Sequence, residues 1–360
     1  MSSVAPSNLG PSAGSRAIRR LKRFTRSTNA AILGVLIVIF AVFAIVVPNG
    51  SFLSPFNLTS MASSAAGILI LAVGSTFVII TGELDLSIAS NLLLSGSVGI
   101  LIMTNESVAA LGVWSAILIG ILATFAVGVS VGAVNGLLTT RLRVPSFIVT
   151  LGMLGVALGL AQLLTKGVTP PTVPEQFTDA IGRARILGVG VPVWIALIVT
   201  AIAWFLLAET RFGSHCKAVG SNQNAAMRAG VNVRGVKMAV FMLMGALCAL
   251  AAILDAARFT TISLASHQTD NLVAIAAVII GGTSLFGGRG SIAGTLVGTL
   301  IPIVLLSGLV ISGLDPFWQN IAIGVILVAA VAIDIAQRDR LAGTDSEDYE
   351  EAMLEREVSV

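Results

Sequence analysis

Long apolar segments, separated by short polar ones, follow one another along most of this 360-residue chain. About 20 consecutive apolar residues are enough for a helix to cross the hydrocarbon core of a bilayer. The pattern predicts ten such segments: 30–47, 58–80, 86–104, 112–139, 145–165, 192–208, 238–255, 271–284, 291–311 and 317–335. The segment 271–284 is short for a full crossing, so we expect a tilted or broken helix there. The expected fold class is therefore all-α: a polytopic membrane protein with about ten transmembrane helices.

The composition agrees with this fold class and excludes an ordinary soluble domain. Hydrophobic residues make up 56% of the chain and charged residues only 11%, with a mean hydropathy of +0.96. A soluble domain carries about 25% charged residues. The net charge of +3 gives no indication of nucleic-acid binding. The two cysteines, Cys216 and Cys248, do not form the pattern of a disulfide framework.

Polar tails flank the apolar body, so we expect three parts. Residues 1–29 form a disordered basic tail, residues 30–337 the transmembrane domain, and residues 338–360 an acidic tail. The basic run before the first segment predicts a cytoplasmic amino terminus, because positive charge is retained on that side of the membrane. Further basic residues follow even-numbered segments and place the carboxyl terminus on the same side: Arg141, Arg143, Arg289, Arg338 and Arg340. The segment 166–191 is expected outside, although it carries three basic residues.

The stretch 209–237 is the one long basic segment between apolar segments of membrane length. Within it, residues 222–229 predict a short helix that Asn222 caps and Gly230 ends. Two interpretations follow from the charge alone. The stretch either contacts a soluble partner, or it is a solvated loop whose basic residues only fix the topology.

Small residues recur at four-residue spacing in two of the apolar segments. One row is Gly128, Gly132 and Gly136, and the other is Gly290, Gly294 and Gly298. Such rows predict close helix packing, with a pore lining as the alternative. A weak internal repeat is also visible, since VIITG at 78–82 recurs as VIIGG at 278–282. Membrane transporters are often built from such repeats.

Patterns for catalysis, metal binding or nucleotide binding are not found. The two histidines, His215 and His267, do not stand at metal-ligand spacing with the cysteines. The glycine-rich stretch 281–291 has the glycine spacing of a phosphate-binding loop, but Gly288 stands where that loop needs lysine. We therefore expect a tight interhelical turn there, and a chain that is neither an enzyme nor an ATPase.

Acidic residues lie at the ends of apolar segments in two places. Glu83 and Asp85 belong to the turn TGELDLS at 81–87, where two roles are considered. The first is proton coupling, because carboxylates at a membrane boundary face a partner, a cavity or water. The second is capping of the next helix by Asp85 or Ser87. Asp255 and Arg258 are expected to form an i,i+3 pair at the outer end of their segment.

Four stretches resemble the permease subunits of bacterial ABC sugar importers of the ribose/xylose/galactose type. They are ITGELDLSIAS (80–90), VPSFIVTLGML (144–154), AVGSNQNAAMRAGVNV (218–233) and LVAIAAVIIGGTSLFGGRGSIAGTLVGTL (272–300). The likeness extends from about residue 30 to 337. The chain departs from the family pattern at Glu83, at Ala89 and at Gln223 and Asn224, where the family has glycine, glycine and an acidic residue respectively.

The resemblance implies three groups of functional positions. The loop that couples the permease to its ATPase corresponds to Arg211, Gly213, Ala218, Gly220, Asn222, Ala225, Ala226, Arg228, Gly230 and Asn232. The family's signature turn corresponds to Gly82, Glu83, Asp85 and Ser87. Glycines for packing and conformational change correspond to Gly281, Gly282, Gly287, Gly288, Gly290 and Gly294. No residue is assigned to substrate or metal.

The resemblance also implies the partners. They are a cytoplasmic ABC ATPase that holds ATP and magnesium, a periplasmic or lipid-anchored solute-binding protein, and a second permease copy in the bacterial inner membrane. The function expected is import of a monosaccharide or related small polar solute. An ion-gradient-driven transporter and an ABC permease for another solute, such as a branched-chain amino acid, are the alternatives.

Overall fold

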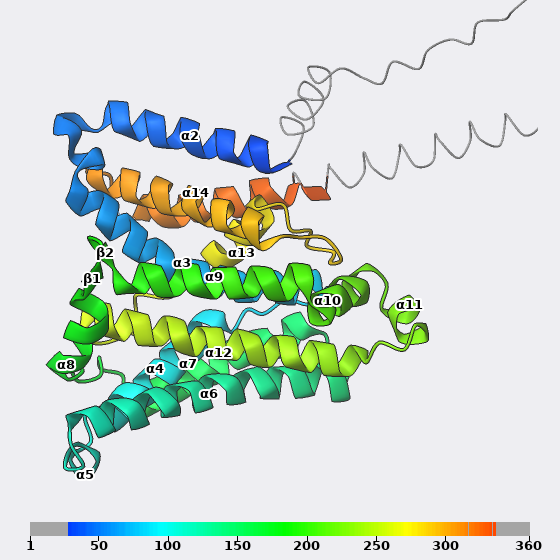
Figure 1. Cartoon of the computed structure of the whole chain (residues 1–360), viewed down its shortest axis with the longest axis horizontal. Helices are drawn as coiled ribbons and strands as arrows, with labels where there is room; N and C mark the ends of the chain where they lie inside the picture. Colours follow the sequence, from blue (N-terminus) through cyan, green and yellow to red (C-terminus); the bar gives the residue numbers. More distant parts are fainter. Residues whose placement is uncertain (1–27, 316, 333, 336–360) are drawn as a thin grey trace, which may run out of the picture.

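The computed structural model describes residues 28–315, 317–332 and 334–335, and these residues fold as an all-α protein (Figure 1). Nine labelled helices coincide with the first nine predicted segments: α2 (Thr28–Val46), α3 (Pro55–Ile80), α4 (Ile88–Met103), α6 (Val113–Arg141), α7 (Ser146–Thr165), α9 (Val191–Glu209), α12 (Val233–Phe259), α13 (Asp270–Ile280) and α14 (Ile292–Ile311). A further apolar helix covers Phe317–Ala332. The expected tails lie outside the described residues, apart from residues 28 and 29.

Six of these helices have the length and apolar character of a membrane crossing: α3, α6, α7, α9, α12 and α14. The shorter apolar stretches are Ile32–Val46 within α2, the helices α4 (Ile88–Met103) and α13 (Asp270–Ile280), and Phe317–Ala332. The 11 residues of α13 rise only about 16 Å, about half of a hydrocarbon core that is ~30 Å thick. The structure therefore establishes a polytopic helical protein, while ten crossings stay a prediction.

Short elements gather at the two ends of the helical body (Figure 1). One end carries η1 (Pro48–Leu53), α5 (Glu106–Ala109), α8 (Glu175–Phe177), η2 (Thr178–Arg183) and the antiparallel pair β1 (Arg185–Ile186) and β2 (Val189–Gly190). The opposite end carries α10 (Arg211–Ser221) and α11 (Gln223–Arg228). Segments expected outside the membrane thus share one end, and the basic segment lies at the other.

The core lies around α3 and α12. In the most apolar 18-residue stretch of each helix, 78% and 61% of the residues are buried. The glycine row of α6 packs directly on α12, since a Cβ atom at Gly128 or Gly132 would overlap the backbone of Gly245 or Phe241. This close approach confirms the packing interpretation of that row. By contrast, α7 and α9 are only 22% and 28% buried and present exposed apolar side chains such as Leu163 and Ile198, as lipid-facing helices do.

Candidate functional site

The basic stretch 209–237 folds into two helices followed by the start of a third. The expected short helix is present as α11, which Asn222 caps by accepting a hydrogen bond of 2.9 Å from the amide of Ala225. Gly230 follows the helix with φ +84°, a backbone conformation that favours glycine. Ala226 is the buried residue of α11, and Arg228 is exposed.

The helix α10 was not expected from the sequence. Thr210 caps it, and its buried face consists of Gly213, Cys216 and Val219, which recur every three residues. This spacing is an amphipathic signal that a search for long apolar segments misses. Burial raises the pKa of the Cys216 thiol to about 12, so this cysteine is an unreactive packing residue.

α12 begins at Val233, five residues before the apolar segment predicted for it. Asn232 caps this helix by accepting a hydrogen bond of 3.0 Å from the amide of Gly235. Val233 and Val236 are buried, whereas Arg234 is exposed. The first turn of α12 is therefore amphipathic, which explains why hydropathy alone assigned it to the loop.

Gly220 lies at a junction of three segments. A Cβ atom there would overlap the carbonyl oxygen of Ile80, at the end of α3, and would lie 2.5 Å from the amide nitrogen of Gly288. The amide of Gly288 donates a hydrogen bond of 2.8 Å to the same Ile80 carbonyl. Gly287 also lies close by, because its Cβ would lie 3.1 Å from the Cα of Gly220. The junction thus brings together three of the four stretches that carry the family resemblance.

The turns after α3 and after α13 have the same backbone geometry. Gly82 and Gly282 have φ angles of +78° and +82°, and each amide donates to the carbonyl three residues before it at 2.9 Å. The next residues, Glu83 and Thr283, donate to the carbonyls of Val78 and Val278 at 3.1 and 3.2 Å. The internal repeat seen in the sequence therefore corresponds to a repeated helix-ending motif.

Asp85 and Ser87 form a buried polar network between α4 and α6. Asp85 Oδ1 accepts hydrogen bonds from the amide of Ser87 at 2.8 Å and from its hydroxyl at 2.6 Å. The hydroxyl of Ser87 accepts a further bond of 2.9 Å from the side-chain amide of Asn135. Ser87 occupies the N-cap position of α4 without a side-chain bond to the helix. The expected capping is therefore wrong for Ser87, whose side chain is engaged in this network, whereas Asp85 accepts from the amide of the N-cap residue, one of the free donors at the start of α4.

Glu83 forms an ion pair with Lys237, at the start of α12. The ammonium group of Lys237 also donates a hydrogen bond of 3.0 Å to the side-chain oxygen of Gln223 in α11. These contacts link the signature turn to α11 and to the start of α12. A cavity of about 690 Å³ adjoins the pair, and its lining includes Thr139, Arg143, Met227 and Arg234.

The remaining glycines of the predicted site lie between α13 and α14. A Cβ atom at Gly281 would lie 2.6 Å from the carbonyl oxygen of Gly294, and one at Gly290 would lie 2.6 Å from the hydroxyl of Thr283. The predicted positions thus group around the Gly220 junction and its neighbouring helix ends. Arg211, Ala225 and Arg228 stand apart as exposed residues, and Ala218 is half-buried.

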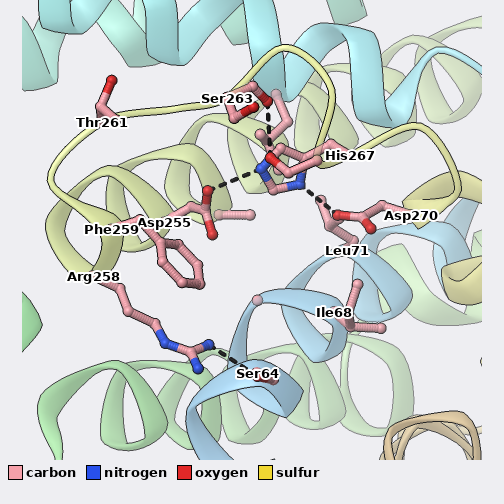
Figure 2. A pocket seen from close by; sticks show the side chains of 14 residues that line it. Ser64, Ile68, Leu71, Asp255, Arg258, Phe259, Thr261, Ser263, His267 and Asp270 are labelled. Atoms are coloured by element: carbon pink, nitrogen blue, oxygen red, sulfur yellow. Dashed lines mark hydrogen bonds and ion pairs between the residues drawn. The ribbon is translucent and has the colours of Figure 1, made fainter. Parts of the chain in front are cut away.

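At the opposite end of the molecule, Asp255 and Arg258 do not form the direct pair expected from their spacing (Figure 2). Asp255 contacts Nε2 of His267 at 2.9 Å instead. Arg258 donates to the hydroxyl of Ser64 at 3.0 Å. The expectation failed because other chain segments provide closer partners, which spacing within one helix cannot indicate.

The chain matches the family described as branched-chain amino acid transport system, permease component, over residues 57–331. It is 37% identical over 287 residues to the ribose import permease protein RbsC of Escherichia coli strain K12, covering 79% of this chain and 87% of that protein. It is 36% identical over 299 residues to the L-arabinose ABC transporter permease protein AraH of Azospirillum brasilense, covering 82% and 84%.

A further relative is the fructose import permease protein FrcC of Rhizobium meliloti, at 34% identity over 302 residues and 80% of each chain. No solved structure gives a significant match. Family members are transport components and not enzymes themselves. The family match over most of the chain and these identities lead to one conclusion: the chain belongs to the family of ABC importer permease subunits that includes the ribose import permeases.

Proposed function

We propose that this chain is the membrane-spanning subunit of an importer that carries a monosaccharide into the cell, driven by ATP hydrolysis in a separate ATPase subunit. The relatives are import permeases named for ribose, fructose and L-arabinose, which supports a sugar as the cargo. The family description names branched-chain amino acids, so an amino acid is the alternative cargo that an experiment should include.

The observation that carries this proposal is the junction at Gly220. The helices α10 and α11 lie at one end of the molecule (Figure 1). At Gly220, near the end of α10, this end contacts both the 81–87 turn and the 281–291 turn. A soluble ATPase that holds α11 can therefore shift the ends of α3 and α13 through a single contact. We infer that α11, with Arg228 and the 54% exposed Met227 on its surface, is the element that the ATPase holds.

The other components follow from family membership and charge. The basic character of the α10–α11 end supports its placement in the cytoplasm, together with both chain termini. The ATPase would hold ATP and magnesium, while a periplasmic or lipid-anchored protein would deliver the solute. A second permease copy, identical or related, would complete the channel.

Reconstitution tests this function. Proteoliposomes that contain the chain, its cognate ATPase and its solute-binding protein should import at least one of D-ribose, D-fructose, L-arabinose and D-allose, and only when ATP is supplied to the ATPase. L-Leucine serves as the alternative cargo. Sugar uptake by the chain alone, driven by a proton or sodium gradient, would overturn the proposal.

A further inference from the structure

A cavity of about 410 Å³ lies at the end of the molecule opposite α10 and α11, between α3, α12 and the loop 260–269 (Figure 2). Its volume falls within the range of small-molecule sites, which is about 300–1,000 Å³. One wall is apolar and includes Ile68, Leu71 and Leu92. The other walls carry hydroxyl, carboxylate, imidazole and guanidinium groups: Ser64, Asp255, Arg258, Thr261, Ser263, Ser266, His267 and Asp270.

The loop that closes this cavity is held in place by its own contacts. Thr260 accepts a hydrogen bond of 2.8 Å from the amide of Val173, and the hydroxyl of Thr261 donates one of 2.8 Å to the carbonyl of Pro170. Gly182 packs directly against the backbone of Ala257. The segment 166–191 therefore holds the loop 260–269 in position, and the wall of the cavity that this loop forms is fixed by these contacts.

The polar groups of the cavity are fixed in position but keep hydrogen-bonding capacity. His267 lies between the two carboxylates, 2.9 Å from Asp255 Oδ2 and 2.7 Å from Asp270 Oδ2. An ionised carboxylate accepts up to about four hydrogen bonds, so each can still accept from a ligand. The side chains of Asp255 and Asp270 are 19% and 18% exposed, and the ligand can therefore reach them.

Arg258 completes the polar wall. Its guanidinium donates to the hydroxyl of Ser64 at 3.0 Å and to the Ser60 hydroxyl at 3.4 Å, both on α3. A guanidinium has five N–H donors, so donors remain for a ligand. The two α3 serines thus hold the guanidinium at the α3 side of the cavity, across from the side where Asp255 and His267 lie (Figure 2).

The charges of the lining residues balance. Burial alone would lower the pKa of His267, but the hydrogen bonds and charges of Asp255 and Asp270 outweigh it and raise the pKa to about 10. At neutral pH the cavity therefore has two carboxylates, one imidazolium and one guanidinium. A net-charged ligand would bring an uncompensated charge into this site, which is costly. A neutral ligand rich in hydroxyl groups meets both donors and acceptors.

We propose that this cavity is a subsite of the transport path that receives a monosaccharide, with Asp255, Asp270 and Arg258 binding its hydroxyl groups. The inference rests on the proposed function, because that function supplies the sugar. The apolar wall at Leu71 and Leu92 faces the carbon skeleton of the ring, and the opposite wall fixes its orientation. Such a site lies where a solute arriving at the outer end first meets the helical body.

A thiol placed in the cavity can report occupancy. The native cysteines, Cys216 and Cys248, are buried, so Ser263→Cys provides an accessible thiol in the lining. Ser107→Cys is the matched control, because Ser107 is exposed at the same end but does not line the cavity. The permease–ATPase complex is labelled with a maleimide, without the solute-binding protein, in the presence of each of the four sugars named above or L-leucine.

We expect the imported sugar to slow labelling of Ser263→Cys by about tenfold when present at roughly ten times its dissociation constant, since protection follows mass action. Labelling of Ser107→Cys should not change. Adding Asp255→Asn to Ser263→Cys should remove the protection. If Asp255 had only a structural role, Asp255→Asn would instead change the labelling rates of both Ser263→Cys and Ser107→Cys in the absence of sugar.

The outcomes separate this inference from the proposed function. If the complex imports a sugar that never protects Ser263→Cys, the subsite is wrong and the function stands. Protection by L-leucine instead of a sugar also contradicts the subsite. If none of the four sugars is imported, the proposed function fails and the subsite fails with it.

Discussion

Gly220 has no room for a side chain, because Ile80 and Gly288 occupy the space that a Cβ atom would need. Asn222 and Asn232 each begin a helix with a side-chain cap, and Gly230 ends one with a positive φ angle. At the residue scale, the small and polar positions of the basic stretch therefore determine its shape. The exposed arginines Arg211 and Arg228 have no such role within the described chain.

Gly220→Val should separate ATP hydrolysis from sugar uptake. Overpacking costs about 1–3 kcal/mol, and a coupling energy of that size corresponds to a change of about 5- to 150-fold. We expect the rate of uptake by the reconstituted complex to decrease by a factor within this range, while the protein still inserts in the membrane. Gly152→Val is the control, since nothing lies within 4 Å of a Cβ atom there. Unchanged ATP-driven uptake in Gly220→Val would contradict the assigned role.

His267 makes a pH-dependent contribution to stability. Its pKa is raised from 6.5 to about 10 in the folded protein, so its stabilising effect is complete below about pH 6.5 and is lost as the pH rises through 10. The charged side chains that line the same cavity are those of Asp255, Asp270 and Arg258. The Tm of the detergent-solubilised protein should therefore fall more between pH 7 and pH 10 in the wild type than in His267→Gln. Parallel Tm curves for the two proteins would refute the assigned protonation state.

Two of the elements that the sequence pattern missed are amphipathic. Both α10 and the first turn of α12 bury only every third or fourth residue, as Cys216, Val219, Val233 and Val236 show. At the element scale, the buried residues of α10 and of the first turn of α12 connect the α10–α11 end of the molecule to the core. The Glu83–Lys237 ion pair joins α12 to the turn after α3, and Gln223 connects the same lysine to α11.

Exchanging the charges of this pair tests whether it holds the elements together. The side chains of Glu83 and Lys237 are 10% and 13% exposed, and breaking a buried pair by removing one partner costs about 3–5 kcal/mol. Glu83→Lys and Lys237→Glu should each lower the Tm and the yield of co-purified ATPase. The double variant should recover most of both, because Gln223 can donate to a glutamate as well as accept from a lysine. Equal losses in the double variant would show that the pair does not act as a unit.

At the scale of the whole molecule, the apolar pattern predicted the positions of the long helices well, because burial and lipid contact both require continuous apolar surface. The resemblance correctly indicated the family. The grouping of the site was not predictable, since the approach of Gly220 to Ile80 and Gly288 depends on how distant segments pack. The cavity around His267 was missed for the same reason: Ser64, Asp255 and His267 come from separate elements, and only the unusual charges at helix ends give a signal.

The hydrogen bond from Gly288 to Ile80 has a consequence for measurement. A backbone amide in a glycine-rich turn ordinarily exchanges its proton with water readily, because such turns open easily. The Gly288 amide is held by a carbonyl of the other repeat, so its proton is released only when the two turns separate. Deuterium uptake at residue 288 therefore reports the separation of the two turns, which is the motion that the partner ATPase would drive.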